Sequence, residues 1–201
     1  MNDISANISD IVGQFLASKR LLQKKNYLVF IGLSGGSDSV ALLHILKSLS
    51  ERHNNNMLLV ATHCNFNLRG EESIRDMEFC KQLCQDLQIR LIVREFNTFK
   101  YMEDHRVSLE VACRELRYNW WKELLEDKEW EHNRGKRFIA VGHHQDDSIE
   151  TILMNLMRGT GIKGLTGIVH HNRQNHVIRP LLCLNRQDII SYCEAEGLQF
   201  E

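Results

Sequence analysis

Four short apolar runs, separated by longer segments with helical periodicity, constrain the fold of this chain more than any other feature. Each run is rich in β-branched residues and continuously apolar, which is typical of strands that are covered on both faces. Because a helical pattern lies between successive runs, the strands can pair in parallel through helical crossovers. The sequence therefore predicts an α/β fold, a doubly wound, mostly parallel sheet with helices on both faces. The predicted strands span residues 27–33, 57–64, 90–96 and 137–143.

The segments around these runs carry the spacing of amphipathic helices. The predicted helices span residues 3–24, 38–50, 71–87, 108–125, 146–157 and 185–196. The pattern is clear in 146–157, where Ile149, Ile152, Leu153 and Leu156 follow the i, i+3, i+4, i+7 template. In open sheets of this kind ligands bind beyond the carboxyl ends of the strands, so binding motifs should follow strands directly.

Length, charge and cysteine content narrow the class of protein. The 201 residues suffice for one domain, and the net charge of −1 predicts no general affinity for a polyanion. A nucleic-acid partner would need a local basic surface or a part of the protein outside this sequence. Neither a membrane span nor a signal peptide is predicted. Six scattered cysteines without a C-x-x-C pair argue against a zinc or iron–sulfur site and suit reduced thiols in the cytoplasm.

The segment SGGSDS, residues 34–39, connects the first predicted strand to the next helix. Gly35 and Gly36 allow close backbone approach, and the amides of residues 37–39 would lie at a helix N-terminus, which favours an anion. The segment therefore predicts a phosphate site, although the sequence G-x-x-x-x-G-K-[ST] of the common kinase and GTPase loop is absent. We expect Asp38 to act through Mg²⁺, because a bare carboxylate would repel phosphate. A tight turn capped by Ser or Asp is the simpler alternative.

A second glycine-rich segment, GTGIKG at residues 159–164, matches the dinucleotide fingerprint G-x-G-x-x-G. That fingerprint requires a strand before its first glycine and an acidic residue about twenty positions later. Here a predicted helix precedes Gly159, and no acid lies near residues 181–184. We interpret Gly159 as a helix C-cap and the remainder as a flexible loop, for which a lid facing the substrate is the best functional hypothesis.

Polar residues also follow the second strand and mark one flank of the helix at 108–125. The residues after the strand, which could bind a base or a phosphate, are His63, Asn65 and Arg69. The residues on the helix flank are Glu110, Arg114, Arg117 and Trp121. A solvated face with a Glu110–Arg114 ion pair is the alternative for this flank, and periodicity alone favours it.

The segment GHHQDDSIET, residues 142–151, places two histidines, two aspartates and a glutamate around the start of a helix. Asp146 and Glu150 lie one turn apart on one face, and Asp147 lies on a neighbouring face. These acids could cap the helix, or they could hold Mg²⁺ and an incoming ammonium group. One aspartate suffices to cap the helix, so the additional acidic residues favour a role in binding or catalysis. Zinc would need a matching set of spaced ligands, which is missing.

The segment SGGSDS resembles the PP-loop, SGGxDS, of the N-type ATP pyrophosphatases, which bind the leaving pyrophosphate of ATP while they transfer its adenylyl group. Five blocks between about residues 28 and 192 further resemble bacterial tRNA(Ile)-lysidine synthetases. The blocks are SGGSDS, HCNFNLRGEES, SLEVACRELRY, AVGHHQDDSIETILMNLMRGTGIKGL and IRPLLCLNRQDIISY. The second block departs from the His-x-x-His-Gly-Leu-Arg of many members, because Phe66 and Asn67 replace the second His and the Gly. Asn tolerates left-handed φ, so the turn can be kept, but any role of that histidine cannot be transferred.

This resemblance implies ATP-dependent ligation of L-lysine to the wobble cytidine of an isoleucine tRNA, with release of AMP and diphosphate. The implied cofactors are ATP and Mg²⁺, and the implied partners are tRNA(Ile) and free L-lysine; a homodimer stays open. Related enzymes continue into domains that hold the tRNA, so residues 1–201 would be an N-terminal PP-loop ATP pyrophosphatase domain that binds ATP but modifies tRNA poorly. The alternatives are another PP-loop tRNA-modifying enzyme, such as a cytidine thiolase, and a non-catalytic adenine-nucleotide-binding module.

The resemblance also implies roles for individual residues. The catalytic candidates are Asp38, Arg114, His143, Asp146 and Asp147. The candidates for holding ATP are Ser34, Gly35, Gly36, Ser37, Asp38, Ser39, His63 and Asn65, with Asp38 as the Mg²⁺ ligand. The candidates for binding substrate are Arg69, Glu110, Arg117 and Glu150. The lysine amine must lose a proton to attack, so a histidine or carboxylate beside it is required.

Overall fold

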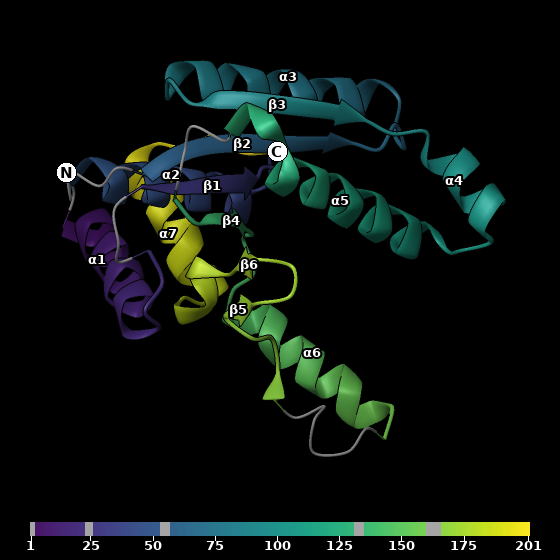
Figure 1. Cartoon of the computed structure of the whole chain (residues 1–201). Coiled ribbons are helices and arrows are strands. Elements are labelled where there is room, and N and C mark those ends of the chain that lie inside the picture. Colours follow the sequence, from purple (N-terminus) through teal and green to yellow (C-terminus); the bar gives the residue numbers. More distant parts are fainter. Residues whose placement is uncertain (1–2, 23–25, 53–56, 131–134, 160–165) are drawn as a thin grey trace.

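The computed structural model describes residues 3–22, 26–52, 57–130, 135–159 and 166–201. In this part of the chain a six-stranded sheet is flanked by helices (Figure 1). The strands lie in the order β3, β2, β1, β4, β6, β5, and all neighbours pair in parallel except β5 and β6. Their bounds are β1 Tyr27–Gly32, β2 Met57–Asn65, β3 Arg90–Glu95, β4 Arg137–Ala140, β5 His171–Asn172 and β6 Val177–Ile178. The predicted fold class is confirmed.

Helices cover the sheet on both faces, as the continuously apolar strands require. The α-helices of the described residues are α1 Asp3–Ser18, α2 Ser37–Arg52, α3 Glu71–Asp86, α4 Thr98–His105, α5 Leu109–Glu126, α6 Gln145–Met157 and α7 Arg186–Glu196. Val29 and Ile31 of β1 belong to an apolar cluster that includes residues of α1, α2, α3 and α7. Leu28 and Phe30 point to the other face, where they join a cluster with Trp120 of α5.

The predicted elements are found, with differences at their ends and some additions. Helix α1 ends at Ser18 rather than near residue 24, and Arg20 and Leu22 beyond it adopt positive φ of 56° and 52°. Helix α4 and strands β5 and β6 were not predicted. The two strands have two residues each, which is too short for a periodic signal, and α4 depends on a local cap in which the Asn97 side chain accepts a hydrogen bond from the N–H of Lys100 at 3.1 Å.

Helix α6 forms as predicted, but its apolar positions are not buried in the described part of the chain. Leu153 and Leu156 are about half exposed, and Met157 is 88% exposed. Figure 1 shows α6 extending away from the sheet. The apolar spacing therefore predicted the helix correctly, although the described residues provide no core that buries its apolar positions. Helix α3 shows a milder difference, because it buries Cys80 and Cys84 while Ile74 is exposed.

The cysteines behave as small packing residues. All six carry free thiols, in agreement with the absence of paired spacing. Burial raises the pKa of Cys80 and of Cys84 to about 12, so both thiols stay protonated near neutral pH. Within the described ranges, no helix has the combination of length and apolar character that crossing a membrane requires.

Candidate functional site

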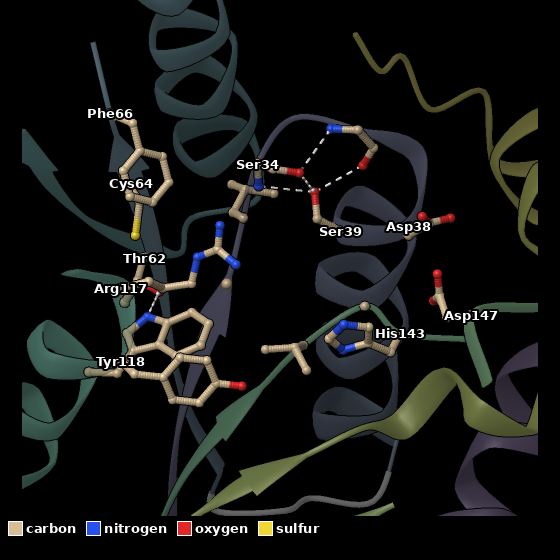
Figure 2. A pocket seen from close by; sticks show the side chains of 16 residues that line it. Ser34, Asp38, Ser39, Thr62, Cys64, Phe66, Arg117, Tyr118, His143 and Asp147 are labelled. Carbon is tan, nitrogen blue, oxygen red and sulfur yellow. Dashed lines mark hydrogen bonds between the residues drawn. The ribbon is translucent and has the colours of Figure 1, made fainter. Parts of the chain in front are cut away.

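A cavity of about 330 Å³ lies at the carboxyl ends of β1, β2 and β4 (Figure 2). The loop after β1 supplies Ser34, and β4 leads into His143, while α5 supplies Arg117, Tyr118 and Trp121. A volume of this size is in the range of small-molecule sites. The position agrees with the expectation that binding motifs follow the first, second and fourth predicted strands.

The hydroxyl of Ser39 holds the loop 34–39 in shape. It accepts hydrogen bonds from the backbone N–H groups of Ser34 at 3.1 Å and Gly35 at 3.3 Å. It donates to the carbonyl oxygen of Gly36 at 2.9 Å, and the Ser34 hydroxyl lies 3.1 Å away. Ser39 as a whole is only 6% exposed. Ser39 therefore organises the loop from within, besides lining the cavity.

The first turn of α2 supplies the amides that a phosphate site needs. The N–H groups of Ser39 and Val40 both donate to the Gly36 carbonyl oxygen at 3.1 Å. The N–H groups of Ser37 and Asp38 have no hydrogen-bond partner among the described residues. Free amides at the start of a helix bind anions well, because the helix dipole adds to their own. The loop thus has the donors that the sequence predicts, concentrated at residues 37 and 38.

Gly142 lets the end of β4 approach this loop closely. A Cβ atom at Gly142 would lie 3.1 Å from the backbone carbon and oxygen of Asp38, a tight contact that would require the backbone to move by a few tenths of an ångström. The absence of a side chain therefore brings residues 143–147 next to the start of α2. This contact joins two sequence blocks that are about a hundred residues apart.

One end of the cavity is acidic. Figure 2 shows Asp38 and Asp147 on the same side, across from Phe66. Between the two aspartates lies the buried ring of His144, whose Nε2 atom is 3.7 Å from a carboxylate oxygen of each. Asp147 also accepts a hydrogen bond from the backbone N–H of His144 at 2.8 Å, so it caps α6. Asp147 is therefore both a cap and a cavity residue.

His143 faces the cavity next to this acidic end. Burial, followed by the positive charge of Arg179, holds the pKa of its imidazole below the usual 6.5. The ring is therefore neutral near pH 7, and its Nδ1 atom is buried without a hydrogen-bond partner among the described residues. A neutral imidazole with a free nitrogen can accept a proton or orient a polar substrate group.

The other end of the cavity is aromatic. Phe66, Tyr118 and Trp121 line it, and the Arg117 guanidinium lies 5.4 Å from the centre of the Phe66 ring and 5.9 Å from that of Trp121. The Trp121 indole N–H donates to the Thr62 hydroxyl at 3.2 Å, which fixes the wall to β2. Flat apolar rings beside a guanidinium suit a heteroaromatic base.

Successive side chains at the carboxyl end of β2 point to opposite faces of the sheet, and only one of these faces borders the cavity. Thr62, Cys64 and Phe66 line the cavity. The two intervening residues, His63 and Asn65, are 4% and 3% exposed and are not among the lining residues. His63 Nδ1 lies 2.9 Å from the Leu33 carbonyl oxygen, and the Asn65 side chain accepts a hydrogen bond from the N–H of residue 67 at 2.9 Å. In this conformation both residues support the loops around the cavity.

The cavity collects some of the predicted site residues and leaves others outside. Those that line it are Ser34, Gly36, Asp38, Ser39, Arg117, His143 and Asp147. Those that do not are Gly35, Ser37, His63, Asn65, Arg69, Glu110, Arg114, Asp146 and Glu150. Asp146 joins α6 to α7, since it accepts a hydrogen bond from the N–H of Arg186 at 2.7 Å. Arg69 pairs with Glu72 at the surface, and Arg114 is exposed with its guanidinium 5.6 Å from the ring centre of Tyr118.

Several cavity residues were not predicted. They are Thr62, Cys64, Phe66 and Tyr118. His144 was not predicted either; it does not line the cavity but contacts Asp38 and Asp147, which do. Side chains alternate between the two faces of a strand, so a predicted strand that reached residue 65 could have indicated that Thr62, Cys64 and Phe66 share one face. Arg179 is a further case, because the residue is only 9% exposed, and its guanidinium lies beside Tyr118 and donates to the Val169 carbonyl oxygen at 2.8 Å. Only its place in the block IRPLL could have drawn attention to it.

The sheet order, the loop after β1 and the amides at the start of α2 define a nucleotide-binding domain of the PP-loop class. A model of the PP-loop domain family matches residues 5–201. The chain therefore belongs to the PP-loop domain family.

Curated relatives are closely similar in sequence. The chain is 50% identical over 172 residues to a tRNA(Ile)-lysidine synthase of Bacteroides thetaiotaomicron, which covers 86% of the chain and 37% of the relative. It is 40% identical over 186 residues to the enzyme of that name from Porphyromonas gingivalis, covering 92% and 38%. It is 41% identical over 191 residues to that of Clostridioides difficile, covering 95% and 39%. The chain thus spans less than two-fifths of the length of these relatives.

Solved structures share the fold at low sequence identity. The U34-tRNA thiolase NcsA from Methanococcus maripaludis, solved with its [4Fe-4S] cluster, matches with a TM-score of 0.75 and 20% identity over 98% of this chain and 66% of that one. An NH₃-dependent NAD synthetase from Campylobacter jejuni matches with a TM-score of 0.56 and 15% identity, over 98% and 75%. At these identities the likeness concerns the fold alone.

Proposed function

We propose that the protein uses ATP to attach L-lysine to the wobble cytidine of an isoleucine tRNA, releasing AMP and diphosphate. The names of its relatives support this proposal. The structural observation that carries it is one cavity with three chemically distinct parts. They are the start of α2, with the free amide of Asp38 and that of Ser37 beside it, the carboxylates of Asp38 and Asp147 with the neutral imidazole of His143, and an aromatic end.

These parts suit ATP in one orientation. The amides of Ser37 and Asp38 bind the β- and γ-phosphates, which leave together as diphosphate. The adenine lies toward the aromatic end, between Phe66 and the residues that follow β1. The α-phosphate then lies between the loop and His143, which is where the reaction must occur.

The acidic end suits Mg²⁺. Asp38 and Asp147 offer hard carboxylate oxygens on the same side of the cavity, and Mg²⁺ is commonly held by one or two carboxylates together with phosphate oxygens and water. Bound there, the ion would neutralise charge on the phosphates of ATP. The residues themselves also act without it, because their carboxylates can attract the ammonium group of an incoming lysine.

The reaction has two displacements. The ring-carbonyl oxygen of the cytidine attacks the α-phosphorus of ATP, and diphosphate leaves. The side-chain amine of lysine then attacks the ring carbon, and AMP leaves with the former carbonyl oxygen. The amine must first lose a proton, for which His143 and Asp147 are the candidate acceptors in the cavity. Positioning and charge stabilisation account for the rate, with no covalent enzyme intermediate.

The alternatives have less support. A thiolase that uses a cysteine needs a reactive thiolate, whereas burial raises the pKa of Cys64, which lines the cavity, to about 11. A binding module without catalysis would not need Asp38, Asp147 and a neutral His143 around one point. The likeness to the thiolase structure concerns the fold and does not favour sulfur chemistry.

The proposal is tested by single-turnover incorporation of radiolabelled lysine into tRNA(Ile), with protein in excess so that weak tRNA binding does not limit the result. Lysine should enter the RNA only with ATP present, and Asp147→Asn should reduce the rate by roughly a hundredfold. Glu150→Gln, one turn further along α6 and exposed, is the matched control and should have a small effect. Incorporation of sulfur in place of lysine, or equal effects of both substitutions, would contradict the proposal.

A further inference from the structure

A second hollow, of about 790 Å³, adjoins the cavity. It lies between the C-terminal half of α5, the start of β4 and the β5–β6 hairpin. Tyr118 and Trp121 line both the cavity and the hollow, so the two sites share a wall. None of the residues assigned above to ATP, Mg²⁺ or lysine lines the hollow. The proposed reaction therefore does not account for it.

The hollow is basic. Lys122, Lys136 and Arg173 line it and are exposed, and Glu126 is its one carboxylate among the described residues. These three cations have no ion-pair partner in the described ranges. Elsewhere in the described part of the chain, the lysines and arginines that form ion pairs are Lys47, Arg52, Arg69, Lys81, Arg90 and Arg94. A chain with a net charge of −1 thus places unpaired positive charge around one depression.

The pKa of His171 is affected by the same group of positive charges. Burial, then the neighbouring Arg173, His170, His176 and Lys136, lower the pKa of His171, which lines the hollow. Its ring packs edge-on against Phe138 at 5.6 Å between centres. The wall shared with the cavity is also aromatic, since Tyr118 and Trp121 meet edge to face at 5.4 Å. Cations interleaved with rings are typical of sites for single-stranded nucleic acid.

We infer that this basic hollow binds the phosphodiester backbone of single-stranded RNA next to the nucleotide that enters the cavity. The occupant is a loop of the RNA substrate, so the inference rests on the proposed function for the identity of that RNA. Lys122, Lys136 and Arg173 contact phosphates, and Tyr118 separates the reacting nucleotide from its neighbour. A hollow of this volume accommodates a nucleotide.

The geometry of α5 connects the two sites. Arg117 lines the cavity and Lys122 lines the hollow, five positions further along the same helix. At about 1.5 Å of rise per residue the two side chains are offset by about 8 Å along the axis. A short run of nucleotides can therefore occupy both sites. Arg137 fixes this arrangement, because its guanidinium donates to the carbonyl oxygens of Leu125 and Asp127 and thereby ties the end of α5 to β4.

The inference is tested by fluorescence anisotropy with a labelled RNA stem-loop that carries cytidine at the wobble position. The double variant Lys136→Ala/Arg173→Ala should bind this RNA roughly tenfold more weakly at low salt. Loss of two phosphate contacts should also reduce the slope of log affinity against log salt by about 1.4, at about 0.7 for each contact. ATP affinity should stay unchanged, because neither residue lines the cavity.

Two control variants make the result specific. Lys136→Arg/Arg173→Lys keeps both charges and should bind RNA like the unmodified protein. Arg75→Ala/Lys100→Ala removes two exposed cations from α3 and α4 and should change the affinity much less. An unchanged salt slope in Lys136→Ala/Arg173→Ala, or an equal loss in the control pair, would overturn the inference. Because the assay measures binding, RNA affinity through the hollow without lysine transfer would contradict the proposed function and leave this inference standing.

Discussion

The Nε2 atom of His144 lies 3.7 Å from a carboxylate oxygen of Asp38. The two residues come from different sequence blocks, one at the start of α2 and one immediately before α6. His144 is 4% exposed, so its ring holds a fixed place in the fold, whereas the Asp38 side chain is 39% exposed and faces the cavity. The phosphate loop and the histidine–aspartate block therefore form a single site, and the predictions below address its parts.

Replacement of Asp38 by asparagine should separate its metal role from any direct role. In the presence of Mg²⁺, ATP should bind to Asp38→Asn at least roughly tenfold more weakly, because a carboxylate ligand is lost. With Mg²⁺ removed by a chelator, ATP should bind equally well or better, because the carboxylate no longer repels phosphate. Calorimetric titration in both buffers measures this. The same loss in both buffers would show that Asp38 does not act through the metal.

Replacement of Ser39 by alanine should loosen the phosphate loop. The N–H groups of Ser34 and Gly35 would lose their acceptor, at a cost of about 1–3 kcal/mol in the free energy of unfolding. ATP affinity should fall by roughly tenfold as the loop loses its shape. Ser37→Ala is the matched control, because the Ser37 hydroxyl donates only to Asp38 at 3.4 Å among the described residues. Denaturant unfolding should show a larger loss for Ser39→Ala, and the reverse order would refute its organising role.

Replacement of Gly142 by alanine should force β4 and α2 apart. The new Cβ would lie 3.1 Å from the backbone of Asp38, so the two segments must separate by a few tenths of an ångström. We expect a cost of about 1–3 kcal/mol and a loss of ATP affinity. Gly36→Ala is a steric control in the same site, because among the described residues the nearest neighbour of its Cβ would be the Ser34 hydroxyl at 3.7 Å, which is an ordinary contact. Thermal unfolding compares the two variants. Equal stability would mean that the close approach at Gly142 is not required.

Stability should fall as the pH is lowered through about 6.5. Burial holds the pKa of His63 below 6.5 in the folded protein, so the unfolded chain binds more protons in this range. Proton uptake then favours unfolding as pH falls, and the contribution of His63 is fully present only above its unfolded pKa. His63→Gln should show a smaller difference in melting temperature between about pH 7.5 and pH 5.5. An unchanged difference would show that His63 does not contribute.

The sheet and the loop after β1 were predictable because both depend on local signals. Continuous apolar runs indicate strands covered on both faces, and SGGSDS combines the small residues of a tight turn with the start of a helix. The location of the site followed from the rule for open parallel sheets. These features need no knowledge of which side chains meet.

Side-chain contacts across the chain were less predictable. His63 and Asn65 carry the right chemistry for a ligand, but the pleat of β2 turns them away from the cavity and presents Thr62 and Cys64 instead. Likewise, the sequence favours His143, which does line the cavity, but it does not indicate that the ring of His144 contacts both Asp38 and Asp147. Which side chains face the cavity depends on the strand register and on the close approach at Gly142, and neither can be derived from a single sequence.

The apolar face of α6 shows that a correctly predicted helix does not imply correctly predicted burial. Its spacing predicts a helix, and the helix is present, yet Leu153 and Met157 are exposed in the described part of the chain. Periodicity reports which residues share a face and not what that face contacts. Burial therefore has to come from the structure.

The most direct measurement of the central claim follows the carbonyl oxygen of the cytidine. An RNA substrate labelled with oxygen-18 at that position is incubated with ATP, lysine and the protein, and the products are analysed by mass spectrometry. If ATP activates the cytidine, the label leaves the RNA and appears in AMP, while the RNA gains one lysine less one water. Label that stays in the RNA while diphosphate is released, or AMP that carries oxygen from the carboxylate of lysine, would contradict the proposed chemistry.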